Sequence, residues 1–211
     1  MSRPYKTGTY IFPPRPEHKI SPDNLNTFDN MEYLAQPKLN GSSCGLYINS
    51  NSFNQKNRHG SPIVNFKMND KEIISLHRGT SDMLIVGEYM NKNQNDGSKK
   101  PFNLKFVIWD ILVLNGEHLV GTTVQERYDL LMKIYEPVSY DEFLYQISEN
   151  VFLVKAFETG FLELYNKISL IDMYEGWVLK RKNAVLERGT RELNNAGWQL
   201  KARKSSNLYS F

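Results

Sequence analysis

Apolar and β-branched residues recur in short runs between residues 32 and 114 of this chain, separated by polar and turn-forming positions. Runs of this length and composition are typical of β-strands. We therefore predict six strands here, over residues 32–38, 44–49, 62–68, 71–76, 82–90 and 104–114. Asn115 and Gly116, a pair that favours tight turns, should reverse the chain after the last of them.

The second half of the chain has a different periodicity. Val124, Tyr128 and Leu131 recur at helical spacing before Pro137, which predicts a helix over residues 123–138. Two further helices are predicted, one over residues 139–150 with Ser139 as its cap and one over residues 160–173. Strands are expected at residues 151–157, 176–182 and 197–203.

Residues 1–30 are rich in proline and polar side chains. This composition predicts an extended lead-in that wraps the domain and ends in a short helix near Pro22. We find no repeat, low-complexity segment or clear linker in residues 31–211. The sequence therefore predicts a single α+β domain built on antiparallel sheets with flanking helices.

Composition is that of a globular protein. Hydrophobic residues make up 40% and aromatic residues 12% of the chain, enough for a sizeable core. The single cysteine, Cys44, excludes an internal disulfide and suits a reducing cytoplasm. The start has no apolar core of a signal peptide, and the longest apolar run, residues 106–114, is too short to cross a bilayer. We expect a soluble cytoplasmic monomer without membrane binding.

Charge is distributed unevenly along the chain. The formal net charge is only +3, yet residues 178–204 contain eight Lys or Arg against two Glu. A basic C-terminal quarter on a nearly neutral protein indicates phosphate binding. A solvated basic surface is the other interpretation, and charge alone does not separate the two.

Lys38 precedes turn formers at the point where a predicted strand ends. A lysine in a turn is usually a solvated surface charge, but it can be a nucleophile at the mouth of a pocket. Its amine attacks phosphorus only when neutral, which burial or neighbouring cations favour. Gly41, three residues later, would let the backbone approach a phosphate closely.

Three further positions carry polar groups in or beside apolar strands. Arg58 follows a polar stretch and could clamp a phosphate or ribose, although an exposed hairpin loop would look the same. Glu88 lies inside an apolar strand, where a carboxylate is costly unless it is paired or lines a pocket. Trp109 interrupts a buried run and could stack on a base, or belong to the core.

The last two predicted strands carry charges at fixed spacing. Glu175 begins the segment Glu-Gly-Trp-Val-Leu-Lys that ends at Lys180, and it could hold a divalent metal. Lys201 and Arg203 alternate on the next strand and therefore share one face. Together these cations would make a phosphate clamp, and the bland alternative is two surface strands with charged outer faces.

The order of these segments resembles that of the covalent nucleotidyltransferase superfamily. This superfamily contains the ATP-dependent DNA ligases, the RNA ligases and the mRNA-capping guanylyltransferases. The resemblance extends from Lys38 to Lys204, and residues 175–180 are its most specific part. It implies a ligase-type nucleotidyltransferase domain around a nucleotide cleft, occupying residues 31–211 behind the lead-in of residues 1–30.

The resemblance also implies roles for individual residues. Lys38 takes the place of the lysine that becomes covalently attached to a nucleoside monophosphate. The other implied roles are a ribose contact for Glu88, a ribose or phosphate contact for Arg58, base stacking for Trp109, base-edge recognition for Gln36, a metal contact for Glu175, and α-phosphate contacts for Lys180, Lys201 and Arg203. ATP and Mg²⁺, or Mn²⁺ in its place, are the implied cofactors.

The chain departs from the family pattern in three places. Asn40 stands where Asp or His is common, and the last motif is Lys-Ala-Arg where Lys-x-Lys is usual. The sequence ends at Phe211, just past that motif, so we expect no C-terminal OB-fold. An OB-fold helps to orient pyrophosphate in relatives, and the lead-in is the candidate substitute.

We interpret the chain as an ATP-dependent polynucleotide ligase, most similar to phage RNA-repair ligases and small DNA ligases, which makes a phage origin conceivable. It would join a 5′-phosphate to a 3′-hydroxyl in a nicked DNA or RNA-containing duplex through a lysyl-AMP intermediate. One alternative is a capping-type guanylyltransferase, because residues 207–211 are similar to the Asn-x-x-x-Phe tail of those enzymes. Another is a nucleic-acid-binding module that kept the fold and lost catalysis.

Overall fold

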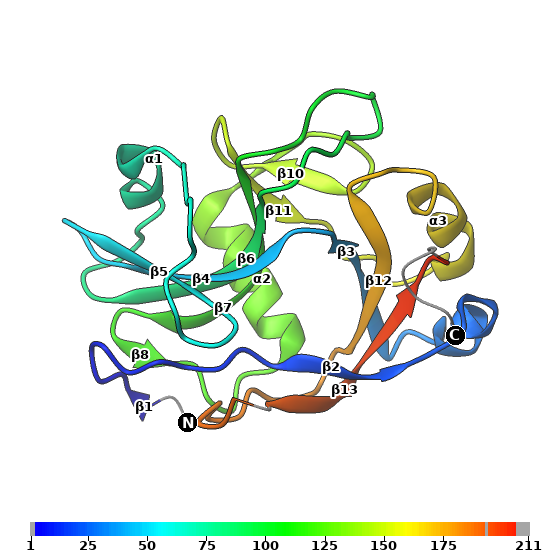
Figure 1. Cartoon of the computed structure of the whole chain (residues 1–211). Helices are drawn as coiled ribbons and strands as arrows, with labels where there is room; N and C mark the ends of the chain where they lie inside the picture. Colours follow the sequence, from blue (N-terminus) through cyan, green and yellow to red (C-terminus); the bar gives the residue numbers. More distant parts are fainter. Residues whose placement is uncertain (1–2, 193, 206–211) are drawn as a thin grey trace.

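The structure, a computed structural model, describes residues 3–192 and 194–205 and consists of two β-sheets with helices on their outer sides (Figure 1). This confirms the predicted α+β class. The first sheet runs in the order β5 (Phe53–Asn57), β4 (Ser42–Ile48), β6 (Met83–Met90), β7 (Lys105–Leu114), β11 (Val151–Val154), β10 (Leu144–Gln146) and β9 (Val138–Ser139), while β8 (Glu117–His118) pairs with β7 and with β1 (Arg3–Pro4). The second sheet runs β2 (Arg15–Lys19), β13 (Asn195–Arg203), β12 (Tyr174–Arg181) and β3 (Tyr33–Leu39).

Most neighbouring strands are antiparallel, as predicted. Within the described residues, β11 pairs with β7 and β2 pairs with β13 in parallel. The strands predicted at 32–38, 44–49, 82–90, 104–114, 151–157, 176–182 and 197–203 are all present, with small shifts at their ends. Asn115 and Gly116 both have positive φ and turn β7 into β8, as their types predicted.

Two of the predicted helices form where helical periodicity was clear. Helix α2 (Val124–Tyr135) begins at a capping box of Thr123 and Glu126 and ends before Pro137. It packs on β7 of the first sheet. Helix α3 (Phe161–Ile168) packs on the second sheet, where the Trp177 indole nitrogen donates to the Phe161 carbonyl at 3.2 Å. No helix among the described residues has the length and apolar character needed to cross a bilayer.

The strand predicted over residues 71–76 is wrong, because this segment forms helix α1 (Asp70–Ile74). The Asn69 side chain caps it by accepting from the backbone N–H groups of Lys71 and Glu72. An N-cap of this kind is worth about 1 kcal/mol and outweighs the strand preference of two adjacent isoleucines. The strand predicted over 62–68 is also absent, and β5, which is mostly polar, was not predicted.

The helix predicted over residues 139–150 is wrong as well. This segment forms the short strands β9 and β10, with a turn between them. The Asp141 carboxylate accepts from the backbone N–H groups of Phe143 and Leu144 and holds that turn. Such local side-chain bonds compete with helix formation, and pairing of β10 with β11 completes the alternative.

The lead-in is extended, as predicted, but it is part of the second sheet. Residues 15–19 form β2, and Ile11 is buried in a small cluster with residues of β6 and β7. The helix expected near Pro22 is the 3₁₀ helix η1 (Pro22–Phe28), which buries Leu25 completely. Because β2 is the edge strand of the second sheet, the lead-in runs along the side on which the two sheets approach one another.

A buried ion pair joins α2 to the middle of the first sheet. The Arg127 guanidinium donates to both carboxylate oxygens of Asp110, at 2.8 and 3.0 Å, and to the Thr122 carbonyl at 2.7 Å. Both side chains are at most 5% exposed. Asp110 directly follows Trp109 in β7, so this pair fixes the strand that carries the indole.

We expect Arg127→Leu to destabilise the fold by about 3–5 kcal/mol, because it leaves the buried Asp110 carboxylate without the guanidinium that donates to both of its oxygens. Urea unfolding monitored by circular dichroism measures the change. The matched control is Lys167→Leu, which removes an exposed ion pair with Glu142 and should change stability little. Equal, small effects of both substitutions would contradict the role assigned to the buried pair.

Candidate active site

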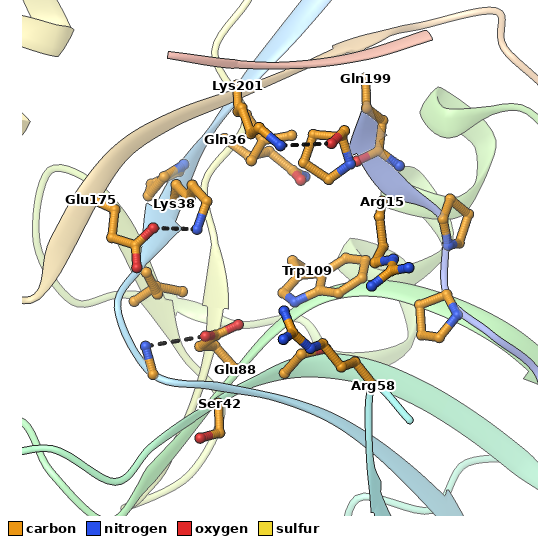
Figure 2. A pocket seen from close by; sticks show the side chains of 18 of the residues that line it. Arg15, Gln36, Lys38, Ser42, Arg58, Glu88, Trp109, Glu175, Gln199 and Lys201 are labelled. Carbon is orange, nitrogen blue, oxygen red and sulfur yellow. Dashed lines mark hydrogen bonds and ion pairs between the residues drawn. The ribbon is translucent and has the colours of Figure 1, made fainter. Parts of the chain in front are cut away.

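The two sheets enclose a cavity of about 760 Å³, a size typical of ligand pockets. Its walls contain every site residue predicted from the sequence: Gln36, Lys38, Gly41, Arg58, Glu88, Trp109, Glu175, Lys180, Lys201 and Arg203. Figure 2 shows the side chains of seven of them pointing into the same space: Gln36, Lys38, Arg58, Glu88, Trp109, Glu175 and Lys201. The structure therefore brings the predicted residues together, while the role of each remains a prediction.

The second sheet presents its functional side chains in rows across three strands. In one row Lys38 of β3, Gly176 of β12 and Arg203 of β13 are neighbours, since Gly176 pairs with both of the others. In the next row Val178 lies between Gln36 and Lys201, and in the third Lys180 pairs with Gln199. Because side chains alternate along a strand, all three rows face the cavity.

Lys38 lies where the chain leaves the second sheet for the first. Strand β3 ends at Leu39 and β4 begins at Ser42, so Lys38 is at the mouth of the cavity. Its amine donates to the Glu175 carboxylate at 2.5 Å, and the Arg203 Nε lies 3.4 Å from the same oxygen. The sequence alternatives for Lys38 were a solvated turn and a pocket lysine, and the geometry is that of a pocket lysine.

Glu175 reaches the cavity because β12 is irregular at this point. In a regular strand Glu175 and Val178 would face opposite sides, since their separation is odd. The pairing with β3 shifts register between Tyr174 and Gly176, and Gly176 has a φ of 133°. A Cβ at Gly176 would lie 2.1 Å from the Ala202 carbonyl oxygen, so only glycine permits this bulge.

Glu88 and Gly41 contact one another where the chain passes from β3 of the second sheet to β4 of the first sheet. The Gly41 N–H donates to the Glu88 carboxylate at 3.1 Å, and a Cβ at Gly41 would meet the Tyr89 carbonyl oxygen at 2.5 Å. Burial raises the pKa of Glu88 to about 7, although the Lys38 ammonium and the Gly41 N–H oppose the shift. Burial thus shifts the Glu88 carboxyl toward its neutral form.

Trp109 and Lys180 form the inner wall of the cavity. The Lys180 amine lies 4.9 Å from the centroid of the indole and donates to the Trp109 carbonyl at 3.2 Å. Burial lowers the pKa of Lys180 to about 8. Pairing with Gln199 puts Lys180 in the third row, which is the farthest of the three from Lys38. The resemblance implies an α-phosphate contact for Lys180, and that role stays a prediction.

Lys201 is held by the lead-in. Its amine donates to the Pro16 carbonyl at 3.1 Å, an interaction drawn in Figure 2. Burial lowers the pKa of Lys201, and the neighbouring charges of Arg203, Lys38, Lys19 and Arg15 add to the effect. This set of cations is the arrangement expected of a phosphate site.

At the outer rim of the cavity, side-chain contacts join the lead-in to the loop after β5 and to the loop before β13. Arg58 is exposed at the cavity edge, and its Nε donates to the ring of His59 at 3.0 Å. The other ring nitrogen of His59 lies 2.5 Å from the Glu192 carboxylate, while Arg15 donates to the Glu192 carbonyl at 2.8 Å. These contacts place Arg58 at the rim without burying its charge.

Sequence reasoning missed several lining residues. Arg15, Lys92 and Gln199 also face the cavity. The position of Gln199, two residues before Lys201 on one strand, was a readable signal because it implies a shared face. Arg15 belongs to the lead-in, whose basic residues were expected from the sequence to hold a phosphate backbone. Lys92 gave no comparable signal, since its approach depends on how the loop after β6 folds back.

The donor set suits Mg²⁺ held jointly with a nucleotide. No group of three or more His, Cys, Asp or Glu suited to a metal occurs among the described residues. Mg²⁺ is commonly bound by one or two carboxylates, with phosphates and waters as its other ligands. Glu175, at the cationic end of the cavity, fits that requirement, and oxygen ligands serve Mn²⁺ equally.

We expect Glu88→Gln to stabilise the protein at high pH. The pKa of Glu88 is about 7 in the folded protein and about 4.3 in an unfolded chain, so its ionisation weakens folding as pH rises between those values. The variant should match the wild type near pH 4.5 and melt several degrees higher at pH 8. Calorimetry across that range measures the difference.

The control for this prediction is Glu149→Gln, because Glu149 is exposed and water solvates its carboxylate in both states. Its melting curve should follow the wild type at every pH. A constant gap between Glu88→Gln and wild type from pH 4.5 to 8 would contradict the proposed burial of charge.

Comparison with known proteins identifies the family. The sequence model described as the ATP-dependent DNA ligase domain matches residues 18–199. A comparison with curated protein sequences found no match. Mycobacterial DNA ligase D complexed with ATP and MES has a similar structure, with a TM-score of 0.64 at 14% identity over 92% of this chain and 60% of that one.

Two further solved structures are similar. The ligase domain of LigD from M. tuberculosis gives a TM-score of 0.65 at 14% identity, over 92% of this chain and 60% of that chain. A Lig E DNA ligase, described as binding DNA with a minimal scaffold, gives 0.54 at 16% identity, over 92% and 70%. The chain spans about 60% of the length of the two mycobacterial structures. With most of its length matched by the family's sequence model, the chain belongs to the ATP-dependent DNA ligase domain family.

Proposed function

We propose that this protein is an ATP-dependent DNA ligase that seals nicks through a lysyl-AMP intermediate. The observation that carries the proposal is the position of Lys38, whose amine lies at the mouth of the cavity between Glu175 and a set of cations. Family membership and the similarity to the ATP complex of mycobacterial DNA ligase D support ATP as the nucleotide. The similarity to a Lig E DNA ligase, which is described as binding DNA, supports DNA as the polymer.

The first step is attack on ATP. The neutral amine of Lys38 forms a bond from Nζ to the α-phosphorus, the bond from that phosphorus to the bridging oxygen breaks, and pyrophosphate leaves as the amine loses its proton. Lys201 and Arg203 stand beside Lys38 and stabilise the charge that develops on the phosphate oxygens. Mg²⁺ held by Glu175 would further neutralise that charge.

The next two steps transfer AMP and then release it. A 5′-phosphate oxygen of the nick attacks the phosphorus of lysyl-AMP, so that the P–N bond breaks and the Lys38 amine is regenerated. The 3′-hydroxyl then attacks the 5′-phosphorus, loses its proton, and displaces AMP as the phosphodiester forms. Arg58 and Arg15 at the rim are placed to contact the phosphates of the nicked strand.

Two other functions were considered from the sequence. The tail at residues 207–211, which suggested a capping-type guanylyltransferase, lies outside the described residues. A silent binding module would not need a lysine amine paired with a carboxylate in a cavity that is lined by further Lys and Arg side chains. Neither alternative gains support from the geometry of the cavity, and RNA in place of DNA is a question for substrate assays.

We expect Lys38→Arg to abolish covalent AMP attachment, because the guanidinium keeps the charge but is not nucleophilic. Intact mass after incubation with ATP and Mg²⁺ should show an AMP adduct on the wild type and none on the variant. Lys133→Arg, on the exposed face of α2, is the matched control and should gain the adduct.

The same variant separates the steps. Lys38→Arg should still seal a nick that already carries AMP on its 5′-phosphate, since that step does not use the amine as nucleophile. An AMP adduct on Lys38→Arg, or a wild type that gains no adduct from ATP and seals no nick in DNA, would overturn the proposed function.

A further inference from the structure

Two buried amide groups in the cavity wall have unused hydrogen-bonding capacity. Gln36 and Gln199 are each 2% exposed. The Gln36 Oε1 and the Gln199 Nε2 are buried and have no hydrogen-bond partner among the described residues. Buried polar groups are nearly always paired in folded proteins, so two orphans facing one cavity indicate that a ligand completes them.

The rows of the second sheet show which part of a nucleotide these amides would meet. The row of Lys38 and Arg203 carries two of the proposed phosphate-binding charges, and the next row carries Gln36, Val178 and the third cation, Lys201. Gln199 lies in the third row, beside Lys180 and farthest from Lys38. A nucleotide with its α-phosphate at Lys38 therefore directs its base toward Val178, Gln36 and Gln199.

The first sheet covers that region from the other side. Trp109 lies opposite the two amides in Figure 2, and Lys180 fixes the indole through its carbonyl and its ring. Val178 is the apolar residue between Gln36 and Lys201 on the facing sheet. A flat base between Val178 and Trp109 would present its edge to both glutamines.

We propose that Gln199 is a specificity-determining residue that reads the base together with Gln36. This inference rests on the proposed function and extends it to the choice of nucleotide. Gln36 Oε1 accepts from the exocyclic amine at position 6 of adenine. Gln199 Nε2 donates to a ring nitrogen beside that amine, N1 or N7. Both orphaned groups are then satisfied by one base.

With the two amides oriented as in this structure, the same pair disfavours guanine. Guanine carries a carbonyl oxygen at position 6, which would face the Gln36 Oε1 as acceptor against acceptor. Burial makes such a mismatch costly, because neither oxygen can turn to water. The arrangement therefore selects ATP over GTP through the positions of two amide groups.

The test measures binding without chemistry. Gln36→Leu and Gln199→Leu are each made in the Lys38→Ala background, and affinities for four nucleotides are measured by calorimetric titration with Mg²⁺. The nucleotides are ATP, purine riboside triphosphate, which lacks the amine, and 1-deaza-ATP and 7-deaza-ATP, which each lack one ring acceptor. Each analogue removes the group that one amide is proposed to contact.

We expect each substitution to weaken ATP binding roughly tenfold, as for the loss of a buried hydrogen bond. The effect of Gln36→Leu should vanish with purine riboside triphosphate. That of Gln199→Leu should vanish with one of the two deaza analogues and persist with the other. Both variants should remain at least as stable to heat as the parent, because each loses a buried orphan group.

The matched control is Gln94→Leu. Gln94 is also buried with an orphaned Oε1, but it does not line the cavity. Its substitution should leave all four affinities unchanged. Unchanged ATP affinity in Gln199→Leu, an effect that persists with both deaza analogues, or wild-type labelling by GTP in preference to ATP would overturn the inference.

These outcomes are distinct from failure of the proposed function. A wild type that gains no adduct from any nucleoside triphosphate would overturn the ligase proposal itself. A wild type that gains AMP while Gln199→Leu binds ATP normally would overturn only the role of Gln199.

Discussion

The passage of the chain from one sheet to the other at Asn40 and Gly41 is the constraint on which the cavity depends. Here the backbone of Gly41 packs so closely on β6 that a side chain would collide with the Tyr89 carbonyl. The same glycine donates to Glu88. Because this contact fixes the separation of the sheets, it also sets Lys38 opposite Glu88. A larger residue at position 41 would push apart the two walls that hold a nucleotide.

The cavity walls bury ionisable groups at an electrostatic cost. Burial raises the pKa of Glu88, which favours its neutral carboxyl form. It lowers the pKa of Lys180 and of Lys201, which favours their neutral amine forms. Each group is therefore charged only at a cost in free energy, although its charged form is the one that would contact a nucleotide. A bound anion with hydroxyl groups and a base would satisfy them together. The fold therefore tolerates unfavourable burial of charge at the site, while the apolar clusters of the two sheets stabilise it elsewhere.

The lead-in has a structural role that its composition only suggested. Prolines predicted an extended segment, and the segment is extended, but it pairs with β13 and holds Lys201 through the Pro16 carbonyl. Removing it would expose the edge of β13 and remove the carbonyl that accepts from the Lys201 amine. Its contribution to the site is thus inseparable from its contribution to the fold.

The sequence by itself determined the residue types of the site and which of them share a face, because alternation along a strand is a local property of the backbone. That Lys201 and Arg203 share a face followed from spacing alone, whereas the place of Gln36 came from the family resemblance. Only the tertiary structure decided the rest. Glu175 enters the cavity through a bulge that depends on the Ala202 carbonyl of a neighbouring strand, and residues 71–76 became helical through a cap that outweighed their apolar pattern. Such outcomes depend on contacts between distant segments or on competing local bonds of similar energy, and periodicity along the chain encodes neither.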